Sequence, residues 1–239
     1  MKQINKKYTA LVTGGTRGIG YAIAEKLLDD GMEVMTTGSS EDSNHPDGST
    51  YHQVDFLNDE SLNLFVRFIA EQPIDVLINN AGINKIGKFA DIAIDDFDQI
   101  LKINLRAPFI LSQAVIPHMK SNNWGRIVNI SSIFSHISKE FRASYSASKF
   151  GLDGLTAALS AELSQFGILA NSVGPGFINT DMTRKILGEV GIRDIERQIP
   201  IKRLGDASEI ASLVSWLASE SNTYLTGQNI LIDGGFTRV

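Results

Sequence analysis

Short apolar runs alternate along the chain with longer stretches in which apolar residues recur at helical spacing. The apolar runs predict about seven strands, at 8–13, 32–37, 49–56, 74–82, 125–132, 168–176 and 228–235. The longer stretches predict helices at 18–31, 59–72, 94–119, 143–167 and 206–219. Pro108 lies inside the third of these helices and predicts a kink or a boundary there. Regular alternation of this kind indicates parallel strands joined by helices that cover both faces of a sheet.

Several of the predicted strands are almost continuously apolar, as in "DVLIN" and "RIVNI", which is typical of strands that are buried on both faces. The predicted fold class is therefore α/β, with a Rossmann-type doubly wound parallel sheet in one domain that spans residues 1–239. The polar segment 38–49 is predicted to be an exposed loop. Residues from about 180 to 204 interrupt the alternation, so we interpret them as a lid over a substrate site.

Composition narrows the class of protein further. Of the 239 residues, 43% are hydrophobic and 21% are charged, as in an ordinary globular protein. Because the chain has no cysteine, disulfides, thiolate metal sites and cysteine nucleophiles are excluded. The net charge of -5, without a basic stripe, argues against a nucleic-acid partner. The four histidines are scattered along the sequence, so no metal site is expected.

The start of the chain, "MKQINKKYTALVTGG", has lysines followed by a short apolar run, as a signal peptide would. The run reaches glycines after a few residues and has no small-residue cleavage site, so we do not interpret it as a signal peptide. No window is apolar over the length that a membrane span requires. We therefore expect no membrane association and a cytoplasmic location.

A glycine-rich stretch, "TGGTRGIG" at 13–20, lies between the first predicted strand and the first predicted helix. Gly14 permits a tight turn, and Gly18 and Gly20 allow the backbone and the helix N-terminus to approach phosphate groups. The spacing G-x-x-x-G-x-G differs from the commoner G-x-G-x-x-G, and an ordinary turn would also use glycine. Its position after the first strand of a doubly wound sheet favours a dinucleotide site.

The choice between NAD and NADP depends on the end of the second strand, where an acidic residue would bind the ribose 2′-hydroxyl of NAD. That strand ends in "TTGSS", and the first acid is Glu41. Ser39 and Ser40 can donate hydrogen bonds to a 2′-phosphate, and Arg17 in the glycine turn can supply positive charge. Arg17 is alternatively a solvated loop residue. The pattern favours NADP.

In "YSASK" (145–149), Tyr145 and Lys149 are four residues apart on a predicted helix and so lie on the same face. A nearby cation favours the phenolate, which makes tyrosine a better general acid or base. By itself the spacing is weak, because a surface pair would look the same. Ser132 ends a predicted strand at the sheet edge where ligands bind, and Asn104 is a polar residue within an apolar helical pattern.

Taken in order, these motifs resemble the short-chain dehydrogenase/reductase family along essentially the whole chain. The resemblance also includes "NNAG" (79–82), "GPGFINTDM" (174–182) and "TGQNILIDGG" near the end. It is closest to the 3-oxoacyl-(acyl-carrier-protein) reductases and their relatives. The family resemblance implies a homotetramer, paired through long helices and the last strand.

The resemblance also implies a role for individual residues. Tyr145 would exchange a proton with the substrate oxygen, Lys149 would lower the tyrosine pKa and bind the nicotinamide ribose, and Ser132 would orient the carbonyl. Asn104 would maintain a water relay from Lys149. The implied cofactor-binding residues are Gly14, Thr16, Arg17, Gly18, Ile19, Gly20, Ser39, Asp55, Phe56, Asn80, Ala81, Gly82, Tyr145, Lys149, Pro175, Gly176, Ile178 and Thr180.

The expected function is NADP(H)-dependent reduction of a carbonyl to a secondary alcohol, with a 3-oxoacyl thioester as the expected substrate. An acidic carrier protein needs basic residues near the cleft; Arg126 matches one such position, whereas Phe166 stands where a second arginine is expected. Alternatives are a dehydrogenase of a sugar, polyol or other small polar alcohol, and a non-catalytic NADP-binding regulator.

The loop 133–145 bears on the same question, because it precedes Tyr145 and is polar and bulky. Its residues Phe134, His136, Lys139 and Arg142 could contact a small polar or anionic substrate. They could equally line a rim or a subunit contact.

Overall fold

A seven-stranded parallel sheet forms the centre of the protein, for which we describe a computed structural model covering residues 7–41 and 44–239. The lysine-rich start and part of the predicted loop 38–49 lie outside the described residues. The strand order is β3-β2-β1-β4-β5-β6-β7. The strands are β1 (Thr9–Val12), β2 (Glu33–Gly38), β3 (Thr50–Gln53), β4 (Val76–Asn79), β5 (Gly125–Ile130), β6 (Ile168–Pro175) and β7 (Asn229–Ile232). This order confirms the predicted doubly wound fold, and its switch point lies between β1 and β4.

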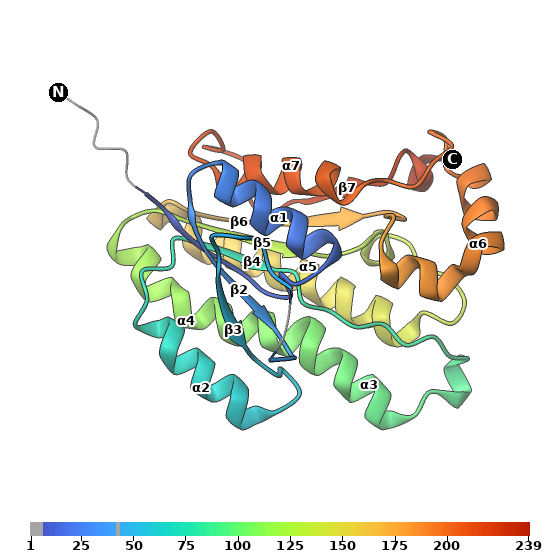
Figure 1. Ribbon diagram of the computed structural model, residues 1–239, viewed down its shortest axis with the longest axis horizontal. Coiled ribbons are helices and arrows are strands. Elements are labelled where there is room, and N and C mark those ends of the chain that lie inside the picture. Colours follow the sequence, from blue (N-terminus) through green and yellow to red (C-terminus); the bar gives the residue numbers. More distant parts are fainter. Residues whose placement is uncertain (1–6, 42–43) are drawn as a thin grey trace.

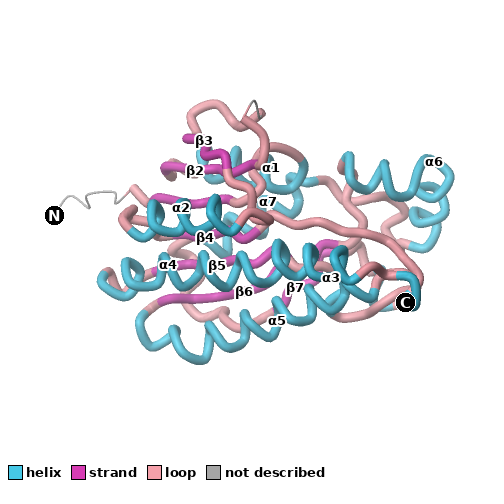
Figure 2. The backbone as a smooth tube through the Cα atoms, turned by 90° about the horizontal axis from the view of Figure 1, so that it is seen from below, coloured by secondary structure: helices cyan, strands magenta, loops and turns pink. Residues whose placement is uncertain are grey.

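Helices cover both faces of the sheet (Figure 1). One face packs against α1 (Gly18–Asp29) and α7 (Ala207–Ala218), and the other against α2 (Asp59–Ala70), α4 (Ala107–Ser121) and α5 (Ala143–Leu163). The view from below shows the helices of this second layer in front of the strands (Figure 2). Residues of β1, β4, β5 and β6 are all buried, as expected for strands between two helical layers. No helix in the described part of the chain is both long and apolar enough to cross a membrane.

The third predicted helix, 94–119, is divided into three parts. It consists of α3 (Ile94–Leu101), a π-helical turn (Lys102–Arg106) and α4, which begins at Ala107. Pro108 stands in the first turn of α4, where its missing N–H is tolerated, so it marks a boundary as predicted. The π turn was not predicted; such turns are frequent at functional sites, and this one contains Asn104.

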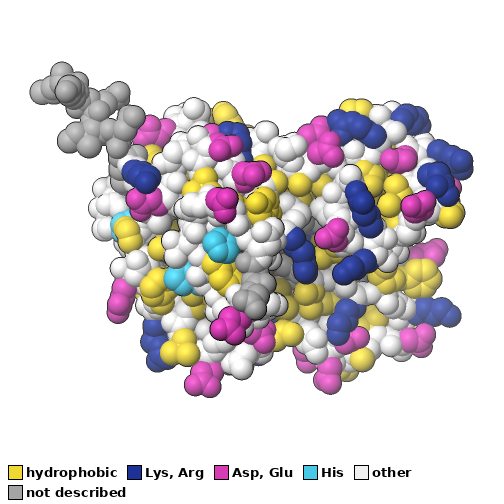
Figure 3. Space-filling model, in the orientation of Figure 1, with side chains coloured by type: hydrophobic (Ala, Val, Ile, Leu, Met, Phe, Trp, Pro, Cys, Tyr) yellow, Lys and Arg dark blue, Asp and Glu magenta, His cyan; other side chains and the backbone are white. Residues whose placement is uncertain are grey.

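The segment that interrupts the sequence pattern contains α6 (Asp181–Gln198), which the periodicity did not predict. The helix is broken at Gly188, which adopts φ 61° and ψ 175° and is not helical. Few of its apolar residues recur at helical spacing. Of the described residues of α6, Ile195 alone is buried. Lys and Arg side chains gather at the end of the molecule where α6 lies (Figure 3).

Candidate active site

The turn between β1 and α1 is shaped by its glycines. Gly14 and Gly18 have φ of 67° and 54°, in the left-handed region that favours glycine. A Cβ atom on Gly20 would lie 2.2 Å from the Gly14 carbonyl oxygen, so no other residue fits there without a backbone shift. Arg17 precedes α1 without capping it, and the first turn holds no acidic residue. The helix therefore presents unoccupied backbone N–H groups, a favourable environment for an anion.

The "NNAG" segment after β4 is fastened to this turn. The Asn80 side-chain amide donates to the carbonyl oxygens of Thr13 (2.9 Å) and Gly14 (3.0 Å). The Thr13 hydroxyl accepts from the backbone N–H groups of Asn80 and Ala81, at 3.0 Å each. Thr13 is not among the site residues predicted from the sequence, although it is a polar residue directly after an apolar strand. These bonds fix the floor of the cleft across the switch point.

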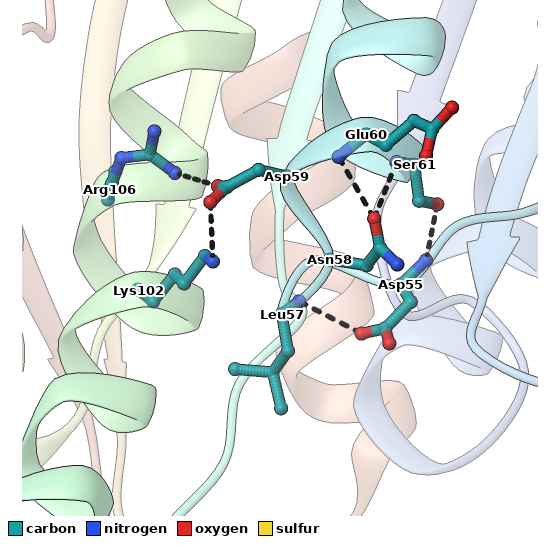
Figure 4. A network of polar contacts seen from close by, with 8 residues as sticks. All are labelled: Asp55, Leu57, Asn58, Asp59, Glu60, Ser61, Lys102 and Arg106. Carbon is teal, nitrogen blue, oxygen red and sulfur yellow. Dashed lines mark hydrogen bonds and ion pairs between the residues drawn. The ribbon is translucent and has the colours of Figure 1, made fainter.

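At the rim of the cleft, Asp55 follows β3 and is held by its own loop (Figure 4). Its carboxylate accepts from Leu57 N–H at 2.9 Å, and its N–H donates to the Ser61 hydroxyl at 3.0 Å. Asn58 caps α2 by accepting from two backbone N–H groups, one of them that of Ser61. Local hydrogen bonds therefore hold this loop in place, and Asp55 lines the cleft.

The start of α2 is also tied to the π turn. Asp59 forms ion pairs with Lys102 at 3.0 Å and with Arg106 at 2.9 Å (Figure 4). Both cations lower the pKa of Asp59 by hydrogen bonding to its carboxylate. This exposed cluster lies outside the cleft and is expected to add little to stability.

Ser132, Tyr145 and Lys149 meet beyond the carboxyl end of β5. Ser132 follows the strand, and its hydroxyl accepts from Phe134 N–H at 3.1 Å. Tyr145 is half-buried in the first turn of α5 and lines the same cleft as Ser132. Lys149, one turn later, donates to the Ile130 carbonyl oxygen at 2.8 Å, and its ammonium nitrogen lies 5.6 Å from the centre of the Tyr145 ring.

Several groups act on the pKa of Tyr145. Burial raises its pKa, whereas the hydrogen bond to Ser132 and the charge of Arg142 lower it. The sequence named Lys149 as the cation that lowers this pKa. In the structure the Lys149 ammonium is directed to the Ile130 carbonyl, and burial lowers its own pKa to about 8, opposed by the charge of Asp153. The charge of Arg142, three residues before the tyrosine, favours the phenolate.

Asn104 is completely buried and lies behind this group. Its side chain accepts from Ile83 N–H and donates to Ile83 O, both at 2.9 Å, and it donates to the Ser148 hydroxyl at 3.1 Å. Ser148 in turn donates to the Tyr145 carbonyl oxygen at 2.7 Å. Asn104 thus connects the π turn, the segment after β4 and the helix that carries Tyr145. It does not line the cleft itself.

Arg126 does not occupy the position that carrier docking would require. It lies near the amino end of β5, opposite the cleft, and is 4% exposed. Its guanidinium donates to four backbone carbonyl oxygens, those of Gly125, Gly167, Ser219 and Asn222, and lies 4.5 Å from the Trp124 ring centre. A buried, fully bonded arginine cannot meet an acidic partner, so the suggestion that Arg126 contacts a carrier is wrong.

One cleft of about 390 Å³ brings together the residues that the sequence assigned to the cofactor. Ser132 and Ser40 also line it, as does Ile83, which had no assigned cofactor role. The assigned residues that line it are Gly14, Thr16, Arg17, Gly18, Ile19, Gly20, Ser39, Asp55, Phe56, Asn80, Ala81, Gly82, Tyr145, Lys149, Pro175, Gly176, Ile178 and Thr180. The start of α6 contributes Asp181, Met182 and Thr183, so the predicted lid segment borders the cleft.

A glycine turn for phosphates joined in one cleft to a serine, a tyrosine and a lysine defines a dinucleotide-dependent oxidoreductase. The chain belongs to the short-chain dehydrogenase/reductase family, and it is an oxidoreductase of that family. The family model that matches residues 14–237 is described as enoyl-(acyl carrier protein) reductase. The family predicted from the sequence is confirmed.

Two curated relatives are 3-oxoacyl-(acyl-carrier-protein) reductases. That of Aquifex aeolicus is 40% identical over 238 residues, which cover 95% of this chain and 96% of the relative. That of Salmonella typhimurium is 39% identical over 241 residues, which cover 96% and 97%. Among solved structures, the gluconate 5-dehydrogenase of Burkholderia cenocepacia in complex with NADP and tartrate matches with a TM-score of 0.89 at 26% identity, covering 97% of this chain and 96% of that one.

Proposed function

We propose that this oxidoreductase uses NADP(H) to interconvert a ketone and a secondary alcohol. The observation that carries the proposal is the position of Tyr145, which lies with Ser132 and Lys149 in the same cleft as the glycine turn. A proton donor and a phosphate-binding turn in one cleft are what carbonyl reduction by a nicotinamide requires.

The residues of the cleft fit the dinucleotide. Gly20 and Gly14 lie close together and carry no side chains, so phosphates can approach the backbone there. The start of α1 has no side-chain cap and offers its backbone N–H groups to the phosphates. When bound, the nicotinamide supplies or accepts the hydride. In the reductive direction the carbonyl carbon gains that hydride and the Tyr145 hydroxyl gives its proton to the oxygen, which yields the secondary alcohol. Ser132 orients the carbonyl oxygen, and Asn104 positions α5 through Ser148.

The preference for NADP rests on charge. Arg17 is exposed at the mouth of the cleft, and Ser39 and Ser40 follow β2 where an acidic residue would select NAD. The relative of known structure from Burkholderia cenocepacia carries NADP. Arg17→Ala should weaken NADPH binding at least tenfold and NADH binding much less, as measured by fluorescence titration. An equal loss for both cofactors would show that Arg17 does not contact the 2′-phosphate.

For the substrate, we favour a small polar ketone or alcohol. Of the two positions where a carrier-binding arginine is expected, one holds the buried Arg126 and the other holds the half-buried Phe166. Neither supplies a cation to an acidic carrier. A cation does lie near the second position, because Lys120 is 4.5 Å from the centre of the Phe166 ring. A 3-oxoacyl thioester is the second candidate, and the identity of 40% to a 3-oxoacyl-(acyl-carrier-protein) reductase favours it.

The test is an absorbance screen that pairs NADPH and NADH with 3-oxoacyl thioesters, diketones and oxo-sugars, and pairs NADP⁺ with sugar alcohols and hydroxy acids. Tyr145→Phe should abolish turnover while NADPH still binds, because only the transferable proton is removed. Tyr224→Phe is the matched control, since Tyr224 is 94% exposed. Turnover of the Tyr145→Phe protein near the wild-type rate would refute the proposed role, and turnover of thioesters alone would select the second candidate.

We also propose a homotetramer that pairs through α4 and α5. A groove lined by Leu101, Leu105, Phe109 and Leu155 borders these helices, and Phe109 is 45% exposed. Exposed apolar side chains of this size are typical of protein interfaces. Light scattering should give four times the mass of the chain, and Phe109→Glu should lower it.

The segment 180–204 remains our proposal for a lid. Its first residues border the cleft, and the non-helical Gly188 offers a hinge in α6. Hydrogen exchange in α6 should slow when NADPH binds, whereas unchanged exchange would argue against closure.

A further inference from the structure

Arg142 is a buried cation without a hydrogen-bonding or ion-pair partner among the described residues. The residue is 9% exposed. Its side chain has no hydrogen bond or ion pair with any described residue, in contrast to Arg126, whose guanidinium meets four carbonyl oxygens. A buried arginine normally has its donors satisfied, because leaving a charge both desolvated and unpaired is costly.

The position of Arg142 makes this more unfavourable still. It is the residue directly before α5, where the partial positive charge of the helix N-terminus disfavours a cation. The first turn of α5 holds no acidic residue that would compensate. Phe141, the residue before it, adopts φ 65°, which is uncommon for a bulky side chain. A cation at this place is not explained by the stability of the fold.

The surroundings of Arg142 belong to the reaction site. The centre of its guanidinium lies 5.5 Å from the centre of the Phe134 ring, and that ring meets the Tyr145 ring edge-on at 6.4 Å. Arg142 directly precedes α5, and Tyr145 lies in the first turn of that helix. Phe134 also contacts the Phe177 ring, at 6.4 Å, which closes one apolar side. Arg142 therefore lies one aromatic ring away from Tyr145, although it does not itself line the cleft.

We propose that Arg142 binds the carboxylate of a small oxo or hydroxy acid whose reacting carbon lies at Tyr145. This inference rests on the proposed function, and it adds the class of substrate: a carboxylic acid in which the carboxylate is separated by a few carbons from a ketone or a secondary alcohol. Arg142 is thus a specificity-determining residue. The substrate carboxylate replaces the missing partner, and the apolar ring of Phe134 excludes water from the ion pair.

A carboxylate fits this place better than the other candidate groups. The planar guanidinium matches a planar carboxylate through two parallel hydrogen bonds. A phosphate dianion carries more charge and usually draws several cationic or N–H donors, whereas Arg142 is a single buried cation. A thioester is neutral and would leave the guanidinium unpaired. The solved gluconate 5-dehydrogenase of the same fold is a sugar-acid enzyme whose structure holds tartrate, a dicarboxylate.

The first experiment measures binding, so that it does not depend on turnover. The full-length protein with NADP⁺ is titrated calorimetrically with tartrate, gluconate and 3-oxobutanoate, with the neutral polyol sorbitol, and with inorganic phosphate. We expect at least one carboxylate to bind, and its Kd to rise roughly 100-fold in Arg142→Gln. Arg67→Gln is the matched control, because it removes an exposed arginine of α2 that does not line the cleft and should leave the Kd unchanged.

Several results would overturn the proposal: binding of none of the carboxylates, an equal Kd in Arg142→Gln and the wild type, or phosphate binding more tightly than every carboxylate. Failure of the proposed function looks different, because it would appear as absent NADP(H) binding or as full turnover by Tyr145→Phe. Circular dichroism and the melting temperature establish whether Arg142→Gln is folded. If it is not, Arg142→Lys keeps the charge and should retain carboxylate binding, weakened by the loss of the planar fork.

The second experiment compares a matched pair of alcohols, gluconate and sorbitol, which share a carbon count and differ in the acid. In the wild type we expect kcat/KM for gluconate to exceed that for sorbitol. In Arg142→Gln this ratio should fall roughly 100-fold, mainly through KM for gluconate, because any change at Tyr145 itself affects both alcohols alike and cancels in the ratio. A merely structural role would lower both substrates equally and leave the ratio unaltered, which would contradict the assignment.

Discussion

Replacing Lys149 by methionine should make the protein inactive but more stable at neutral pH. Lys149 is 4% exposed, and burial lowers its pKa from 10.5 to about 8. The folded chain therefore holds this proton less tightly than the unfolded chain does. A methionine fills a similar volume without a charge, so the variant should gain stability wherever the wild type must bury the ammonium ion.

The magnitude follows from the two pKa values. One pKa unit corresponds to about 1.4 kcal/mol, so burying the charge costs about 3 kcal/mol of folding free energy at pH 7. Methionine loses the hydrogen bond from Lys149 to the Ile130 carbonyl oxygen, which contributes about 1 kcal/mol. The net expectation is a gain of about 2 kcal/mol at pH 7.

The pH dependence separates this effect from ordinary repacking. Between pH about 8 and 10.5 the unfolded chain binds more protons at Lys149 than the folded chain, so wild-type stability rises with pH in that window. The advantage of Lys149→Met should accordingly shrink by about 2 kcal/mol between pH 7 and pH 9.5. Tyr8 and Tyr145, whose pKa values are raised by burial, oppose the rise only above pH about 10.

Urea unfolding without cofactor, at one fixed protein concentration, measures this difference at pH 7, 8, 9 and 9.5. Lys185→Met is the control, because it removes an exposed ammonium group by the same substitution and shows whether the trend belongs to the buried site. A Lys149→Met protein that is less stable than the wild type at pH 7, or a difference that stays constant to pH 9.5, would refute the reasoning.

Three further expectations concern Gly20, Arg126 and Arg142. Gly20→Ala places a Cβ 2.2 Å from the Gly14 carbonyl oxygen, so NADPH affinity should fall at least tenfold in a fluorescence titration; unchanged affinity would mean that the turn adapts. Arg126→Met leaves backbone carbonyl oxygens unpaired, so urea unfolding should show a loss of roughly 2–4 kcal/mol, while kcat of the folded enzyme stays the same. Arg142→Gln removes a charge that lowers the pKa of Tyr145. The pH range in which kcat/KM for sorbitol oxidation rises should therefore move to higher pH. An unchanged pH profile would contradict this electrostatic role.

The fold could be predicted because strands that are buried on both faces are almost continuously apolar in sequence. The runs that form β4 and β5 are almost entirely apolar, and all their residues are buried. The ends of the helices and strands were harder to predict from the sequence. The strand predicted at 49–56 pairs only over Thr50–Gln53, since its later residues turn to form the loop that holds Asp55. The amphipathic signal of α6 is weak, because Gly188 breaks it and few of its side chains are buried.

The cofactor side of the site could be predicted for a related reason. Parallel strands bring their carboxyl ends to one edge, so motifs that directly follow strands must lie near one another. The glycine turn, the Asn80 segment and Ser132 all follow this rule. The π turn around Asn104 could not be predicted from the sequence, because it depends on hydrogen bonds between Asn104 and two residues far away in the sequence, Ile83 and Ser148.

The substrate side shows where sequence reasoning stops. Arg126 and Arg142 look equally available in the sequence, and both are buried in the structure. What distinguishes them is the number of acceptors that distant segments bring to each. Gly167, Ser219 and Asn222 contribute carbonyl oxygens to Arg126, and these residues are 41 to 96 positions away. Arg142 receives no such acceptor from the described chain, so its charge remains for a ligand to neutralise. The identity of the substrate therefore depends on which buried cations the fold leaves unpaired, and that property exists only in three dimensions.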